Sequence, residues 1–224
     1  KAETALLCCM IKSGEALLCA MEEMARYGIS FSDSAINAFA EGLLARSVTG
    51  EKLDIPLALS MLPQEAAAFD LLDRLGIEYD RVSHDAAFNM ELCAEVGRVL
   101  DVSVCKNLFL CNRQKTQFYL LCMMPDKPFH TKDLSAQIHS ARLSFAPEEL
   151  LWELLHCTPG SATVLGLAND TERRVQLLID KETYEAEYFS CHPCLCTSTI
   201  KLKTSDVKNM LLPKVHHEPI VVEL

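Results

Sequence analysis

The sequence has 224 residues, half of them hydrophobic, which is enough for one sizeable domain or for one domain with an appendage. Its formal net charge of −10 argues against broad nucleic-acid binding through a general basic field, although a local basic patch could still recognise one nucleic-acid end. No apolar run is long enough to cross a membrane, so no membrane partner is expected. An odd count of eleven cysteines, in a chain that can build a core without disulfides, indicates a reducing compartment, and we expect a cytoplasmic protein.

The first 62 residues form a stretch dominated by Ala, Leu, Met and Glu, with apolar positions that recur at helical spacing. This stretch carries no recognisable catalytic motif. We therefore expect residues 1–62 to be a helical N-terminal extension that caps the fold or binds a partner. The segment 55–63, which contains two prolines, is predicted to join this extension to a second domain over residues 63–224.

From Gln64 onward, helices and strands are predicted to mix without regular alternation. The helices are expected at 64–75, ending at Gly76, and at 88–100, 131–139, 147–156 and 204–212. The strands are expected at 79–83, 104–111, 118–121, 174–180, 188–191, 197–203 and 219–224. This irregular order favours the α+β class over a doubly wound parallel sheet.

The most informative strand is 104–111, which is apolar except for the adjacent pair Lys106 and Asn107 and is followed by a second apolar run at 118–121. The pattern predicts a buried β-hairpin. Lysine is rarely buried without a partner, so this pair indicates either an internal anion or a ligand. The alternative is a lysine at a strand end whose ammonium reaches solvent.

Four residues with metal-binding side chains lie within the segment 191–196, namely Cys191, His192, Cys194 and Cys196. Structural zinc sites usually combine two ligand pairs that are well separated in sequence, and no second CxxC pair exists here. We therefore expect no metal, and we interpret the cysteines as small buried residues. Adjacent strand positions point to opposite faces, which argues against a Cys-His nucleophile, and Pro193 is expected to fix the orientation of His192.

A second motif is the segment 159–167, in which Gly160 and Gly166 flank small and apolar residues. Such a loop allows the backbone to approach a ligand closely, although an ordinary turn between a helix and a strand explains it equally well. It lacks the Gly-Lys-Ser/Thr pattern of a phosphate-binding loop. Asn169 and Asp170 follow it and are also typical of a turn.

Six basic residues lie in or near these segments. If they converge on one cleft they would hold phosphates, and if they are scattered they form a solvated surface. They are Lys106, Arg142, Arg173, Arg174, Lys201 and Lys203.

From about Ala66 to the C-terminus, the chain resembles the YbaK/prolyl-tRNA-synthetase-associated editing domain family. The resemblance rests on an ordered series of short segments. They are Leu-Leu-Asp-Arg-Leu-Gly-Ile (71–77), His84 with Phe88, Lys-Asn-Leu-Phe-Leu (106–110), Arg-Leu-Ser-Phe-Ala (142–146), Pro-Gly-Ser (159–161), Gly-Leu-Ala-Asn-Asp (166–170), His-Pro (192–193), Thr-Ser-Thr-Ile (197–200) and the terminal Glu-Pro-Ile-Val-Val-Glu-Leu. The Lys-Asn and His-Pro segments are similar to those of the free-standing alanyl-tRNA(Pro) deacylase branch.

This resemblance implies a mixed, largely antiparallel curved sheet or barrel surrounded by helices. It also implies hydrolysis of the ester that joins a wrong amino acid to tRNA, without a cofactor. The implied partner is the acceptor end of tRNA(Pro), with prolyl-tRNA synthetase as a further candidate. An aminoacyl ester is already activated, so positioning and electrostatics suffice for its hydrolysis.

The resemblance assigns roles residue by residue. Lys106, Gly160 and His192 are the implied catalytic residues: Lys106 meets the phosphate or ribose of the terminal adenosine, the loop at Gly160 positions water, and His192 sets the pocket size. Asn107 orients the aminoacyl group. The other implied substrate-binding residues are Phe88, Arg142, Ser144, Ser161, Gly166, Asn169, Asp170, Thr197 and Thr199.

Three alternatives remain open at this point. The same reaction could act on another small residue, such as Ser, Thr, Cys or aminobutyrate. The domain could instead be a non-catalytic module that binds tRNA or a synthetase. A cysteine-rich metal or redox protein is the third possibility.

Overall fold

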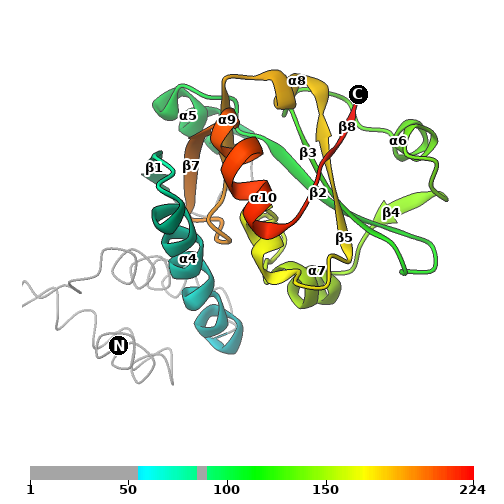
Figure 1. Cartoon of the computed structure of the whole chain (residues 1–224), viewed down its shortest axis with the longest axis horizontal. Coiled ribbons are helices and arrows are strands. Elements are labelled where there is room, and N and C mark those ends of the chain that lie inside the picture. Colours follow the sequence, from blue (N-terminus) through cyan, green and yellow to red (C-terminus); the bar gives the residue numbers. More distant parts are fainter. Residues whose placement is uncertain (1–54, 85–89) are drawn as a thin grey trace, which may run out of the picture. The chain divides into compact units, whose positions relative to one another are not determined.

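The computed structural model describes residues 55–84 and 90–224 (Figure 1). The chain divides into two compact units, residues 1–67 and 68–224. Most of the first unit lies outside the described residues, so the helical extension over 1–62 and the domain boundary after residue 62 stay predictions. No described helix is long and apolar enough to span a membrane.

The first described element is helix α4 (Ile55–Leu75), which includes the segment that the sequence analysis assigned to a joint. The helix expected at 64–75 therefore begins earlier, at Ile55, and the role of 55–63 as a joint stays a prediction. Pro56 lies in the first turn of α4, where its missing N–H would have no helical partner in any case, and the helix continues past Pro63. The helix ends at Gly76 as expected, and Gly76 has a φ of 66°, which glycine adopts at little cost.

The described strands form two sheets. The smaller has the order β1-β7-β6 and the larger has the order β4-β2-β3-β5-β8. Within the described residues, four of the six strand pairings are antiparallel, and only β3–β5 and β5–β8 are parallel. The expected mixed, largely antiparallel α+β fold is therefore confirmed. The strands are β1 (Tyr79–Ser83), β2 (Lys106–Asn112), β3 (Phe118–Met123), β4 (Leu143–Phe145), β5 (Val175–Asp180), β6 (Tyr188–Cys191), β7 (Ser198–Lys203) and β8 (Ile220–Val222).

The helices agree with the sequence pattern at most positions. Those expected at 88–100, 131–139 and 147–156 are α5 (Met90–Leu100), α6 (Thr131–Gln137) and α7 (Glu148–Leu155). The last expected helix is a continuous helical run of α9 (Thr204–Asp206), the π-helical turn η2 (Val207–Leu211) and α10 (Leu212–Val215). Two short helices and one strand were not expected: η1 (Val164–Asn169), α8 (Lys181–Glu185) and β4.

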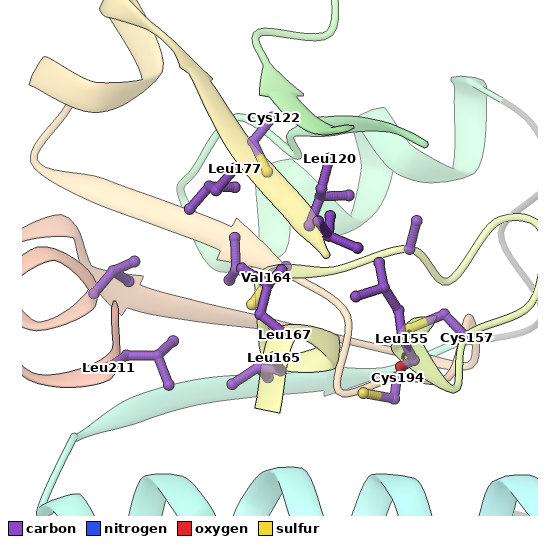
Figure 2. Packing of buried hydrophobic residues seen from close by; sticks show 14 of the residues in the cluster. Leu120, Cys122, Leu155, Cys157, Val164, Leu165, Leu167, Leu177, Cys194 and Leu211 are labelled. Carbon is purple, nitrogen blue, oxygen red and sulfur yellow. Dashed lines mark hydrogen bonds between the residues drawn. The ribbon is translucent and has the colours of Figure 1, made fainter. Parts of the chain in front are cut away.

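Alternating side chains of β2, β3 and β5 pack on opposite faces of the larger sheet. One face contributes Phe109, Leu120 and Leu177 to the main core, which also contains buried side chains of β6, β7 and η1. Figure 2 shows part of this core, with Leu120, Leu177 and residues of η1 among its labelled side chains. The other face packs Leu121 and Leu178 with Leu134 of α6 in a second cluster. Burial on both faces explains why β3 is apolar along its whole length rather than alternating.

Candidate functional site

A cavity of about 150 Å³ lies at the N-terminal end of β2, within the second unit. Its wall brings together four residues from three separate segments: Lys106 and Asn107 at the start of β2, Gly160 in the loop after α7, and His192 just after β6. The remaining lining residues are mostly apolar: Cys93, Val104, Cys105, Pro125 and Ala162. The three residues implied to be catalytic and Asn107 therefore surround one small space.

The Lys106 ammonium is held by two backbone carbonyls. Its Nζ donates to the oxygen of Lys127 at 3.0 Å and to that of Pro125 at 3.5 Å. Within the described part of the chain, no carboxylate forms an ion pair with it. The sequence argument offered an internal anion or a ligand as the partner of this lysine. Among the described residues, carbonyl dipoles rather than an anion hold the ammonium at the cavity, and they leave its charge uncompensated.

The Asn107 amide also has one bonded and one unbonded end. Its Nδ2 donates to the oxygen of Ala162 at 2.8 Å, which joins β2 to the loop that contains Gly160. Its Oδ1 is buried and has no hydrogen-bond partner among the described residues. A buried acceptor without a partner is costly, so it indicates a donor that arrives with a ligand.

The His192 imidazole is oriented by its own turn. Nδ1 lies 2.9 Å from the oxygen of Ser198, so Nδ1 carries the proton that it donates. Burial lowers the pKa of His192; the bond to the Ser198 carbonyl opposes this shift, and the nearby His84 ring adds to it. The ring is therefore neutral near pH 7, and Nε2 is its acceptor nitrogen.

The cysteines around this turn are buried and reduced. Cys191, Cys194 and Cys196 are not joined in disulfides, and Cys194 has a φ of 62°, in the left-handed region. Burial raises the pKa of the Cys191 thiol, which keeps it protonated and unreactive. Across the described residues, no group of three His, Cys, Asp or Glu side chains is arranged to hold a metal ion.

Comparison with known proteins places the sequence in a family. The sequence profile of the aminoacyl-tRNA editing domain matches residues 84–210, more than half of the chain. The chain belongs to the aminoacyl-tRNA editing domain family. This confirms the resemblance inferred from the short segments.

Relatives of known name support the same membership. Prolyl-tRNA synthetase associated domain-containing protein 1 of Danio rerio is 31% identical over 155 residues, which cover 68% of this chain and 83% of the relative. The prolyl-tRNA editing protein ProX of Acetoanaerobium sticklandii is 29% identical, over 62% of this chain and 85% of that protein. A crystal structure described as a candidate trans-editing enzyme for prolyl tRNA synthetase shares the fold, with a TM-score of 0.55 at 12% identity over 72% of this chain and 98% of that one.

Several residues that the sequence analysis assigned to substrate lie away from the cavity of this editing domain. Ser144 lies on β4, opposite Cys111, and β4 pairs with the C-terminal end of β2, whereas Lys106 begins that strand. Arg142 directly precedes β4 and is exposed. Phe88 lies outside the described residues.

The polar side chains of Ser161, Asn169 and Asp170 form hydrogen bonds within the editing domain. The Ser161 hydroxyl donates to the oxygen of Thr158 at 3.0 Å, and Asn169 donates to the oxygen of Leu155 at 3.1 Å. The Asp170 carboxylate accepts from the backbone N–H groups of Arg174 and of Val175, the first residue of β5. These contacts account for the three side chains without a ligand.

Thr197 and Thr199 lie behind the cavity rather than in its wall. The carbonyl of Thr197 accepts from the N–H of His84 at 2.9 Å. The Thr199 hydroxyl lies 2.9 Å from Nε2 of His84 and 3.4 Å from Nδ1 of His192. Thr199 thus helps to orient the two imidazoles, whereas Thr197 holds the backbone of His84.

The six basic residues do not converge. Arg174 pairs with Glu153 at 2.8 Å, and Lys201 donates to the oxygen of Leu100 at 2.9 Å. Of the six, Lys106 alone is part of the described cavity wall. Sequence reasoning missed Cys93 and Pro125, and no local signal could have found them, because they lie on α5 and after β3, away from Lys106 in the sequence.

Gly166 is required by packing. A Cβ at this position would lie 2.9 Å from the oxygen of Leu155 and 3.0 Å from Sγ of Cys157. We expect Gly166→Ala to lower the free energy of unfolding by about 2–3 kcal/mol, because η1 must move away from the end of α7. Chemical denaturation measures this change.

Gly76→Ala is the matched control, since a Cβ there meets nothing within 4 Å and only its φ of 66° is unfavourable. We expect it to cost about 1 kcal/mol. An equal or smaller loss for Gly166→Ala would contradict the packing argument.

Proposed function

We propose that this protein is an aminoacyl-tRNA deacylase that removes small amino acids mischarged onto tRNA(Pro), alanine first among them. The observation that carries the proposal is the cavity of about 150 Å³ with an unpartnered Asn107 oxygen beside it. Membership of the editing domain family supports the reaction class, and the names of the relatives support tRNA(Pro).

The size of the cavity suits a small aminoacyl group. An apolar cavity of about 150 Å³ accommodates a molecule the size of benzene, which has only a few heavy atoms. This volume restricts the substrate to small residues, but it also admits the five-membered ring of proline. The preference for alanyl over prolyl esters therefore rests on the resemblance to the alanyl-tRNA(Pro) deacylase branch, in which His192 sets the pocket size.

The polar groups suit the rest of the substrate. Oδ1 of Asn107 accepts from the α-ammonium of the amino acid, which supplies the donor that this oxygen lacks. The Lys106 charge faces the phosphate or ribose of the terminal nucleotide. The backbone of the Gly160 loop, with a φ of 87° at Gly160, approaches the ester closely, and Nε2 of neutral His192 is available to accept a proton from water.

The reaction then needs no enzymatic nucleophile. The water oxygen attacks the ester carbonyl carbon, and the bond from that carbon to the ribose oxygen breaks. The ribose oxygen leaves as a hydroxyl and takes up the proton, assisted by the neighbouring ribose hydroxyl. Orientation and fixed dipoles supply the acceleration in this scheme.

The test is single-turnover hydrolysis of tRNA(Pro) charged with alanine, serine, threonine, cysteine, aminobutyrate or proline. We expect alanyl-tRNA(Pro) to be hydrolysed at least about tenfold faster than prolyl-tRNA(Pro), a difference of roughly 1.4 kcal/mol in activation free energy. A preference for another small residue would change the substrate while keeping the reaction. Equal hydrolysis of alanyl and prolyl esters, or hydrolysis of neither, would overturn the proposal.

A further inference from the structure

The turn after β3 both lines the cavity and holds Lys106. Lys106 pairs with Met123, the last residue of β3, and the chain continues from there into the segment 124–127. Pro125 of this segment forms part of the cavity wall, and the carbonyls of Pro125 and Lys127 accept the two hydrogen bonds of the Lys106 ammonium. The position of this ammonium therefore depends on the conformation of residues 124–127.

The backbone of this turn constrains it only weakly. The N–H of Lys127 donates to the oxygen of Met124 at 3.4 Å, which is longer than an ordinary N–H···O hydrogen bond of about 2.9 Å. Pro125 has no N–H with which to donate a further hydrogen bond. A turn held in this way needs an additional attachment if its carbonyls are to stay in one place.

A side-chain ion pair supplies that attachment. Nζ of Lys127 lies 2.7 Å from Oδ2 of Asp180, the last residue of β5, and 3.1 Å from Oε2 of Glu182 in α8. The side chain of Asp180 is 0% exposed, whereas that of Glu182 is 62% exposed. Because solvent weakens an exposed ion pair, the pair with Asp180 is the stronger constraint on the turn.

These contacts form a continuous path from the buried end of β5 to the cavity. Oδ1 of Asp180 accepts from the N–H of Leu224 at 3.2 Å, which fixes the carboxylate on its second side. Oδ2 of the same carboxylate holds the side chain of Lys127, and the backbone oxygen of Lys127 holds Lys106. Lys127 is not among the residues that line the cavity, so its path to the substrate runs through Lys106.

We propose that Lys127 is a positioning residue for Lys106, because its ion pair with the buried carboxylate of Asp180 fixes the turn whose carbonyls direct the Lys106 ammonium into the cavity. This inference rests on the proposed deacylase function and extends it to residues outside the cavity wall. It gives the buried charge of Asp180 a purpose beyond the stability of the fold.

The first test is a double-mutant cycle. We expect Lys127→Met to lower kcat/KM for alanyl-tRNA(Pro) at least fivefold in the wild-type background. In the Lys106→Ala background, the same change should lower it less than twofold, since the residue that Lys127 positions is already absent. Lys127→Arg keeps the positive charge and should recover most of the lost activity.

The matched control is Lys181→Met. Lys181 also forms an ion pair at the start of α8, with Glu223 at 2.6 Å, but it makes no hydrogen bond to the turn after β3. This variant should stay within twofold of the wild type. A loss in Lys127→Met that is equally large with and without Lys106 would show a general structural effect and would overturn the positioning role.

A paired variant guards against unfolding, since Lys127→Met leaves the buried Asp180 without its cationic partner. Lys127→Met combined with Asp180→Asn removes both charges, and the amide oxygen of asparagine can still accept from the N–H of Leu224. Circular dichroism verifies folding. The paired variant should show the same dependence on Lys106 as Lys127→Met, and additive losses would overturn the proposal here too.

The second test does not depend on hydrolysis. An amine must release its hydrogen bonds and its proton before it can be acetylated, so a well-held ammonium reacts slowly. We expect acetic anhydride to acetylate Lys106 at least threefold faster in Lys127→Met than in the wild type or in Lys181→Met, as measured by peptide mass spectrometry. The exposed Lys203 serves as the internal standard.

The two tests separate this proposal from the deacylase function. Faster acetylation of Lys106 in Lys127→Met, together with an absence of hydrolysis by the wild type, would support the positioning of Lys106 and overturn the deacylase function. Unchanged acetylation in Lys127→Met, with the wild type active, would overturn the positioning role and leave the deacylase function standing.

Discussion

Lys106→Ala is expected to slow deacylation of alanyl-tRNA(Pro) at least about tenfold, which corresponds to about 1.4 kcal/mol or more of lost transition-state stabilisation. The reason is the position of the ammonium, which the carbonyls of Lys127 and Pro125 hold at the cavity without neutralising it. A tRNA phosphate would supply the missing negative charge. Single-turnover hydrolysis measures the loss.

The positive charge of Lys106 should also affect how strongly substrate binding depends on salt concentration. Added salt should weaken substrate binding by the wild type more steeply than binding by Lys106→Ala, since one phosphate contact contributes to the counterion slope. Lys106→Gln keeps a donor for the carbonyls but removes the charge, so it separates electrostatics from local structure. Lys203→Ala, at an exposed position on β7, is the matched control and should behave as the wild type.

The role of Lys106 would be refuted by a folded Lys106→Ala protein that retains the wild-type rate and salt slope. In that case, the lysine would only stabilise the turn at Pro125 and Lys127. If Lys106→Gln alone retained activity, the hydrogen bonds rather than the charge would be the important feature.

Asp170→Ala is expected to lower the free energy of unfolding by about 3 kcal/mol or more. The carboxylate is 4% exposed and accepts hydrogen bonds from the backbone N–H groups of Arg174, at 3.0 Å, and Val175, at 2.7 Å. It also lies 3.1 Å from Nε2 of the buried His217. Removing it leaves several buried donors without an acceptor, each of which is costly.

Chemical denaturation and hydrolysis kinetics together test this structural role. At a temperature where Asp170→Ala is still folded, the KM for alanyl-tRNA(Pro) should equal that of the wild type. Glu172→Ala, an exposed carboxylate in the same loop, should change neither stability nor KM. A raised KM with unchanged stability would instead assign Asp170 to the substrate, as the family resemblance implies.

The sequence alone determined the fold class and most elements of the second unit. The buried hairpin of β2 and β3 was predictable because burial on both faces requires long apolar runs. The helix end at Gly76 was predictable because the position requires a left-handed residue. Lys106 could be selected because a lysine in an apolar strand is unusual, whereas the role of His192 was implied only by the resemblance to the family.

Only the tertiary structure shows where the side chains of the selected residues lie and what they contact. Lys106, Gly160 and His192 share one cavity because the loop after α7 and the turn after β6 both approach the start of β2. Ser161, Asn169 and Asp170 look equally functional in the sequence, yet their hydrogen bonds hold turns in place. The short strand β4 and the helix α8 escaped prediction because segments of three and five residues carry almost no periodicity. Cys93 and Pro125 became candidates only through their position in the cavity wall, since contacts between distant elements leave no local pattern in the chain.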